Sequence, residues 1–132
     1  MRAELKIEIA RPPGDVFAYL TDVTNLPAWQ SGVRSATERD GRIEESRSLL
    51  GKEFDTSLEI LEREVPRLFT LRALDGPVPF TVRHELEPTD AGTRLTVTAE
   101  GDVPGFAAGL LARGAERQFR KDFERLKQIL ES

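Results

Sequence analysis

The sequence predicts an α+β fold in which a curved antiparallel sheet of about seven strands wraps around a long C-terminal helix. Three observations predict it. Apolar and polar residues alternate at period two in residues 4–10 and through most of residues 33–102, as in half-buried strands. An apolar stripe at helical spacing runs through residues 105–130. Two short helical segments separate the first strand from the second. The chain of 132 residues has the size of one domain, which we assign to residues 1–132.

The N-terminal segment predicts one strand followed by two short helices. In "ELKIEIA" the large apolar residues fall on one face of a strand. Pro12 and Pro13 end this strand because neither donates a backbone hydrogen bond. Apolar residues then recur at helical spacing, with Asp22 and Thr24 as candidate helix caps. Neither helix is long enough to persist alone. We therefore expect residues 11–29, called the clip below, to pack over the mouth between the sheet and the final helix.

Turn residues divide residues 33–102 into about six further strands. Each break contains glycine or proline, which turns favour. The breaks lie at Asp40-Gly41, Gly51-Lys52, Val65-Pro66, Asp75-Gly76-Pro77 and Asp90-Ala91-Gly92. One-sided alternation with short turns is typical of an antiparallel sheet with one face in water.

The final helix has two different halves. The C-terminal half presents Phe119, Phe123, Leu126 and Leu130 on one side. The N-terminal half presents mainly small residues, with Gly109 and Gly114 beside a stripe of Ala108, Leu111, Ala112 and Ala115. Small residues either bring the helix close to the sheet or leave space. We expect an apolar ligand to enter between this half, the clip and the sheet.

Composition excludes several classes of protein. The net charge of −4 disfavours a nucleic-acid-binding protein, which usually has an excess of basic residues. The chain has no cysteine, a single histidine and no carboxylates at metal-loop spacing, so we expect no cofactor and no metal. No apolar run reaches the length of a membrane span, and the N-terminus lacks the apolar region of a secretory signal. The expectation is a cytoplasmic monomer or homodimer without stable membrane insertion.

Four segments occur in the order seen in a known family. They are "IEIARPPGDVFAYLTDVTNLPAW", "LLGKEFDTSLEILEREVPRLFTLRAL", "AGTRLTVTAEG" and "FRKDFERLKQILE". Together they resemble the polyketide cyclase/dehydrase and lipid-transport family of the START-like (SRPBCC) superfamily. The resemblance covers nearly the whole chain and implies a helix-grip fold that encloses a hydrophobic cavity. It does not select one activity, because that superfamily includes binders, transfer proteins and a few enzymes.

His84 is a candidate for ligand binding or catalysis. It shares the strand phase of Phe80, Val82 and Leu86, which predicts that it points to the concave face of the sheet. There it could contact a ligand carbonyl or act as a general base. The structural interpretation is a histidine held by a hydrogen bond near the end of its strand.

The register of residues 43–50 stays open at this point. Either Glu45 and Arg47 or Ser46 and Ser48 face inward. An inward Glu–Arg pair is costly unless its members meet each other or a polar ligand, so a charged outer face is the simpler interpretation. On the next strand, Thr56 lies among apolar residues and either offers its hydroxyl to a ligand or simply packs.

Three other groups also have two interpretations. Asp122 either caps a polar group in the cavity or lies at the border of the helix stripe. The basic residues Arg113, Arg117, Arg120 and Lys121 form either a solvated face or a contact for an anionic partner or lipid head group. The aromatic clip, with Tyr19 and Trp29, is core, a lid over the ligand, or both.

The sequence therefore predicts a protein that binds or carries a small hydrophobic molecule, such as a lipid, isoprenoid or polyketide. The alternative is a cyclase or dehydratase that uses His84 with Arg47 or Thr56, and a third possibility is an interaction protein with a filled core. The binder is favoured because an enzyme needs an acid, a base and a donor around one substrate. The residues expected to contact the ligand are Phe17, Leu20, Trp29, Arg47, Thr56, Phe69, Leu71, Phe80, Val82, His84, Leu111, Ala112 and Ala115.

Overall fold

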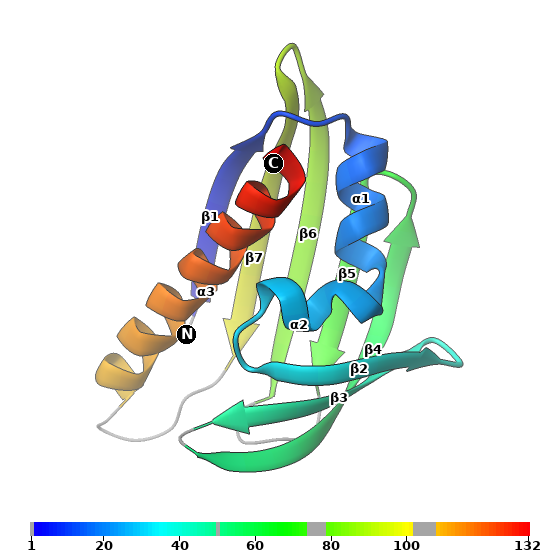
Figure 1. Ribbon diagram of the computed structural model, residues 1–132. Helices are drawn as coiled ribbons and strands as arrows, with labels where there is room; N and C mark the ends of the chain where they lie inside the picture. The colour runs from blue at the N-terminus through cyan, green and yellow to red at the C-terminus, as the bar shows by residue number, and fades with distance from the viewer. Residues whose placement is uncertain (1, 50, 74–78, 102–107) are drawn as a thin grey trace.

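A computed structural model of the chain describes residues 2–49, 51–73, 79–101 and 108–132, without the side chains of residues 49, 108–113 and 115. Seven strands form one antiparallel sheet in the order β1-β7-β6-β5-β4-β3-β2, and all helices lie on one face of it (Figure 1). This is the predicted fold class. The elements are β1 (Arg2–Ile9), α1 (Pro13–Thr21), the 3₁₀ helix η1 (Val23–Asn25), α2 (Leu26–Trp29), β2 (Val33–Arg39), β3 (Arg42–Leu49), β4 (Lys52–Glu64), β5 (Leu68–Ala73), β6 (Phe80–Thr89), β7 (Gly92–Gly101) and α3 (Ala108–Glu131).

The clip contains one more element than predicted. Between the two α-helices, Asp22 Oδ1 accepts hydrogen bonds from the Thr24 backbone N at 3.1 Å and from the Thr24 hydroxyl at 2.7 Å, which caps η1. Asp22 is thus a cap, as predicted, whereas Thr24 donates to it and caps nothing. These contacts turn the chain from α1 into α2, which lies beside α3 at the mouth of the sheet (Figure 1).

The outer face of the sheet is covered by paired charges. Arg83 contacts both Glu62 and Glu85, at 3.1 and 3.3 Å, and Arg94 contacts Glu8 at 2.8 Å. Glu8 and Arg94 lie on neighbouring strands and Glu85 lies two residues from Arg83, whereas Glu62 is reached across the intervening strand β5; side chains of one face meet in these positions. The predicted period-two pattern is therefore confirmed, with charge outside and apolar residues inside.

The alternation breaks in β4, besides a register shift between Val33 and Ser35 in β2. A register shift between Ile60 and Glu62 leaves Leu61 with 42% of its surface exposed. Beyond this β-bulge the strand changes phase, so Arg63 lies opposite Phe69 and its guanidinium carbon lies 5.4 Å from that ring. A bulge inserts one extra residue and reverses the faces after it, which sequence alternation alone does not predict.

Candidate functional site

A row of rings crosses the core from the clip to the final helix. Phe17 meets Phe69 edge-on with centroids 6.3 Å apart, and Phe69 lies 5.7 Å from the ring of His84. His84 lies 5.8 Å from Phe123, which lies 5.0 Å from Trp29. All five side chains are buried. The sequence placed four of them around a ligand; in the structure they also pack against each other and form the centre of the core.

His84 is held in one tautomer. Its Nδ1 lies 2.9 Å from the carbonyl oxygen of Phe69, and because a carbonyl only accepts, Nδ1 carries the proton. Burial lowers the pKa of His84 from 6.5 to about 4, and the hydrogen bond to Phe69 only partly offsets this. The ring is therefore neutral near pH 7 and a weak base. The hydrogen bond of the structural interpretation is present, although His84 lies in the middle of β6 and not near its end; the strand phase predicted its inward direction correctly.

Apolar residues of the concave face are more completely buried at one end than at the other, which we call the half-open end. At the end of the sheet where β1 leads into the clip, Leu86, Leu95 and Ile9 are buried. In the opposite direction, the next concave row contains Leu71 opposite Val82, and both remain partly exposed. The same holds for other apolar side chains at that end, namely Phe54, Ile60, Phe80 and Ala99. Leu58 and Ala73 at the same end are buried, so the contact with solvent is confined to part of this end.

A buried ion pair lies on the same face. Glu45 lies opposite Thr56 and Arg47 opposite Phe54, in phase with Ile43, so the charged-outer-face interpretation is wrong. Arg47 Nε donates to Glu45 Oε1 at 3.1 Å and Nη2 donates to Oε2 at 3.3 Å. The Glu45 carboxylate is only 1% exposed. Burial raises the pKa of Glu45, and the nearby Arg47 counteracts this rise.

Two residues of the α2–β2 connection border this pair. Gln30 Oε1 accepts a hydrogen bond from Arg47 Nη2 at 3.1 Å. A Cβ atom placed on Gly32 would lie 3.7 Å from Arg47 Nη1, so the connection runs close to the guanidinium. Next to Gln30 in the chain, Trp29 is 1% exposed, and its Nε1–H has no acceptor in the described part of the molecule. This end of the concave face therefore combines apolar walls with a few buried polar groups.

The structure places most of the predicted contact residues on the concave face or on the clip that covers it, at two depths. Phe17, Leu20, Trp29, Phe69 and His84 are fully buried in the core. The others border the half-open end: Arg47, Thr56, Leu71, Phe80 and Val82. The predictions for Leu111, Ala112 and Ala115 fall on side chains outside those that the structure describes.

The predicted contact residues did not include Glu45 and Gln30, which the structure places against Arg47. Glu45 was named only as one of two register alternatives, and its pairing with Thr56 on β4 is a tertiary fact. Its only sequence signal is its spacing of two from Ile43. Nothing in the sequence indicated Gln30, because a polar residue in a loop after a short helix is expected to lie on the surface.

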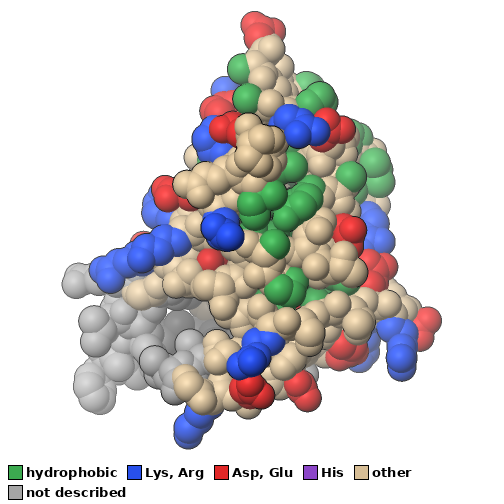
Figure 2. All heavy atoms as spheres, viewed as in Figure 1, with side chains coloured by type: hydrophobic (Ala, Val, Ile, Leu, Met, Phe, Trp, Pro, Cys, Tyr) green, Lys and Arg blue, Asp and Glu red, His purple; other side chains and the backbone are tan. Residues whose placement is uncertain are grey.

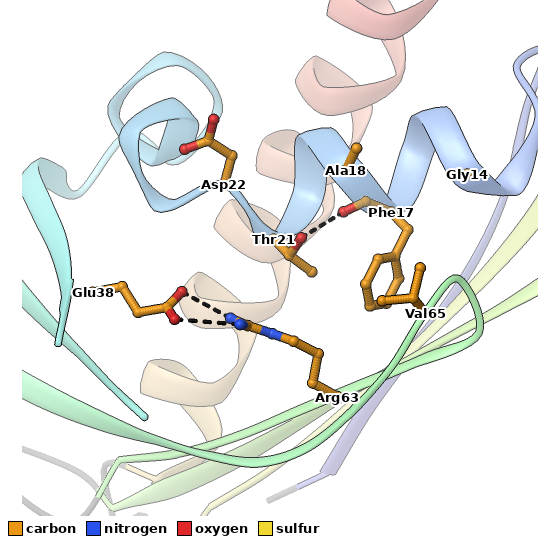
Figure 3. Close-up of a pocket in the computed structure, with 8 residues that line it drawn as sticks. All are labelled: Gly14, Phe17, Ala18, Thr21, Asp22, Glu38, Arg63 and Val65. Atoms are coloured by element: carbon orange, nitrogen blue, oxygen red, sulfur yellow. Dashed lines mark hydrogen bonds and ion pairs between the residues drawn. The ribbon is translucent and has the colours of Figure 1, made fainter. Parts of the chain in front are cut away.

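A separate pocket of about 370 Å³ lies outside the core, between α1 and the strands β2 and β4. Its lining includes Phe17, Ala18 and Val65, and Val65 is 74% exposed. Figure 3 shows Glu38 and Arg63 facing each other across its floor, where two hydrogen bonds of 2.8 and 3.2 Å join them. We call it the α1 pocket. Sequence analysis did not predict this pocket, because the β-bulge in β4 is what turns Arg63 toward it.

The outer surface of α3 carries several basic side chains, and that of Arg113 lies outside those described. Figure 2 shows Lys and Arg side chains gathered along this helix, and Arg117, Arg120 and Lys121 are exposed. Asp122 lies at the border of the helix's buried stripe, where it accepts hydrogen bonds from the Ser31 backbone N at 3.3 Å and from Gln118 at 2.8 Å. The border interpretation of Asp122 therefore describes the structure.

Residues 2–49, 51–73, 79–101 and 108–132 contain neither a membrane-spanning helix nor a group of metal ligands. None of the helices in these parts of the chain is both long and apolar enough to cross a membrane. Within the same residues, histidines and carboxylates nowhere gather in threes around a point that could hold a metal ion.

Comparison with known proteins agrees with this architecture. The model of a family described as "Polyketide cyclase / dehydrase and lipid transport" matches residues 1–131. No curated protein matches the chain. Among solved structures, a conserved protein from Geobacillus kaustophilus superposes with a TM-score of 0.85 at 19% identity, over 98% of this chain and 95% of that one.

Two further solved structures have the same fold. A START superfamily protein from Mycobacterium smegmatis has a TM-score of 0.78 at 15% identity, over 97% of this chain and 98% of that one. The di-domain ARO/CYC StfQ from the steffimycin biosynthetic pathway has a TM-score of 0.78 at 13% identity, over 98% of this chain and 50% of StfQ. At these identities the likeness concerns the fold alone.

Proposed function

Because the chain belongs to the polyketide cyclase/dehydrase and lipid-transport family, we propose that it binds or carries a small hydrophobic molecule in the half-open end of its concave face. The ligand class is that of lipids, isoprenoids and polyketides. One observation carries the proposal: several apolar side chains that face the inside of the sheet at this end keep contact with solvent, whereas those around Leu86, Leu95 and Ile9 at the other end are buried. Partly exposed Leu71, Phe80 and Val82 supply the apolar wall that ligand pockets require.

The buried polar groups support a ligand with one polar end. Apolar pockets orient their ligands with a small number of polar groups, and here Arg47 and Thr56 lie on the same face as the apolar wall. A wholly apolar ligand would make no use of them. We therefore place the apolar body of the ligand along β5 and β6 and its polar end toward β3.

Native mass spectrometry of gently purified protein tests the proposal directly. The expected result is a complex whose extra mass belongs to a hydrophobic molecule that organic solvent removes. Readdition of that molecule should change the emission of Trp29, the only tryptophan. The proposal would be contradicted if the purified protein contained no bound ligand and if neither fatty alcohols nor aromatic ketones changed its Trp29 emission.

Two variants separate the interior from the α1 pocket. Val82→Phe adds volume at the half-open end and should block binding; if the end is open, the stability cost should stay below the roughly 1–3 kcal/mol of overpacking a filled core. Ala18→Phe adds the same ring to the α1 pocket and serves as the matched control, because Ala18 is exposed on α1. If only Ala18→Phe blocks binding, the ligand occupies the α1 pocket.

A cyclase-type reaction in the same cavity is the second candidate, and Glu45 is the observation in its favour. A buried carboxyl with a raised pKa is a typical acid–base group, whereas His84, with its pKa near 4, is a poor base. The identified ligand would then be converted on incubation. Loss of this conversion in Glu45→Gln, with affinity retained, would favour the enzyme, since general acid–base catalysis contributes about 100- to 10,000-fold. A ligand that is never converted favours the carrier.

A further inference from the structure

The Glu45–Arg47 pair has a consequence for which ligands can enter. Both oxygens of Glu45 face the guanidinium, at 3.1 and 3.3 Å, so the positive charge of Arg47 is already neutralised inside the fold. The carboxylate is 1% exposed and Arg47 is 26% exposed. Water therefore screens this pair little, and a further charge placed beside it interacts strongly with both members of the pair.

An ionised ligand meets a repulsive partner whichever sign it carries. A carboxylate that approaches Arg47 comes close to the Glu45 carboxylate, whose negative charge has no other described partner than this arginine. An ammonium that approaches Glu45 comes equally close to Arg47. Buried charges without a compensating partner are costly, and such repulsion is a common source of specificity.

Hydrogen-bond donors for an uncharged group remain available. A guanidinium has five N–H groups, and the described contacts of Arg47 use Nε and Nη2. Among the described residues, none accepts from its Nη1. The indole Nε1–H of Trp29 is likewise buried without an acceptor in the described part of the chain. Free donors suit a carbonyl, hydroxyl or ether oxygen.

We propose that Glu45 is a specificity-determining residue, which restricts the site to ligands whose polar end is an uncharged oxygen group, such as an alcohol, phenol or ketone. It excludes fatty-acid carboxylates and amines. This inference rests on the proposed function, because it assumes that the interior binds a ligand at all. It assigns to Glu45 a role that does not require catalysis.

Three probes of equal chain length test the inference on the wild-type protein: decanol, decanoate and decylamine at neutral pH. Their binding is followed by Trp29 emission and checked by isothermal titration calorimetry. We expect decanol to bind at least about tenfold more tightly than either ionised probe, which is the effect of about 1.4 kcal/mol of unfavourable electrostatics. This measurement needs no variant, so it decides even if a substitution at Glu45 prevents folding.

Glu45→Gln makes the test sharper. The variant leaves Arg47 unneutralised, so decanoate affinity should rise about tenfold or more while decylamine stays weak and decanol changes little. Glu44→Gln is the matched control. It is the same charge change one residue away, on the outer face, where Glu44 accepts from Ser57 at 3.1 Å. This control should leave the order of the three probes unchanged.

The possible failures are distinguishable. If decanoate binds the wild-type protein as tightly as decanol, or if Glu45→Gln and Glu44→Gln have the same effect, the specificity role of Glu45 is wrong and the binding function stands. If none of the three probes binds the folded wild-type protein, the inference is wrong; if this protein also carries no ligand and its emission does not respond to aromatic ketones, the proposed function is contradicted as well.

Discussion

The indole ring of Trp29 lies against the ring of Phe123, with centroids 5.0 Å apart and planes inclined by 58°. Trp29 ends α2 and Phe123 lies in the middle of α3, so this contact fastens the clip to the final helix. Both side chains are nearly free of solvent. Aromatic pairs in such tilted arrangements contribute beyond their buried area, and we expect the pair to hold the mouth of the fold in place.

Replacement of Trp29 tests the importance of this contact. Trp29→Ala should lower the free energy of unfolding by about 3–5 kcal/mol, the usual range for a buried aromatic residue. Trp29→Phe should cost less, because it keeps a ring and removes an N–H that has no described acceptor. Urea unfolding followed by circular dichroism gives both values. Native emission of Trp29 at the wavelength of a water-exposed indole would contradict the packed position.

His84 should make the protein sensitive to acid. Its pKa is 6.5 in the unfolded chain and about 4 in the folded one, so between these values the unfolded state binds a proton that the folded state does not. The free energy of unfolding therefore keeps its full value above pH 6.5. Through His84 it decreases as the pH falls, by about 3 kcal/mol at pH 4.

His84→Gln should remove this part of the pH dependence. The measurement is the free energy of unfolding from urea titrations at neutral pH and near pH 4.5, for both proteins. Glu45, with its raised pKa, acts in the opposite direction, because acid protonates it more readily in the folded state. It is present in both proteins and cancels in the comparison. Equal acid sensitivity of the two proteins would mean that His84 is not buried in neutral form. If His84 is structural, binding of the identified ligand should barely change in this variant.

Two Gly→Ala substitutions should have opposite effects. A Cβ on Gly92 would lie 2.3 Å from the carbonyl oxygen of Ile9, and the φ angle there is 152°. Because the backbone of β1 cannot shift without strain, Gly92→Ala should lower the free energy of unfolding by more than about 2 kcal/mol. At Gly114, in α3, a Cβ meets nothing within 4 Å, so Gly114→Ala should stabilise the helix by about 0.5–1 kcal/mol. Thermal melts compare the two variants, and a Gly92→Ala melt equal to wild type would contradict the close approach of β1.

Removal of the cap on η1 should have a moderate effect. Asp22 accepts two hydrogen bonds from Thr24, and loss of a capping side chain costs about 0.5–2 kcal/mol. Asp22→Asn retains an acceptor oxygen and should behave nearly like wild type, whereas Asp22→Ala should not. Urea unfolding measures both. The same loss in both variants would indicate that charge, rather than the cap, is what Asp22 contributes.

The sequence by itself determined the fold and the face of most residues. Period-two alternation fixes which side of a strand is apolar, and the stripe of Phe119, Phe123, Leu126 and Leu130 fixes the buried side of α3, because local geometry sets both periods. His84 pointed inward for the same reason. Most strand ends followed from proline and glycine, which act through the backbone, whereas the division of the clip into α1, η1 and α2 did not.

Only the tertiary structure decided what the local pattern left undetermined. In β3, both faces carry polar residues, so alternation could not choose between Glu45–Arg47 and Ser46–Ser48; the pairing with Leu58 and Thr56 on β4 made the choice. The β-bulge at Leu61 turned Arg63 toward Phe69, since one extra residue reverses the phase without a mark in the composition. The burial of Glu45 depends on Arg47 and on Gln30 beyond it, and contacts between residues distant in the chain are formed by the folded sheet.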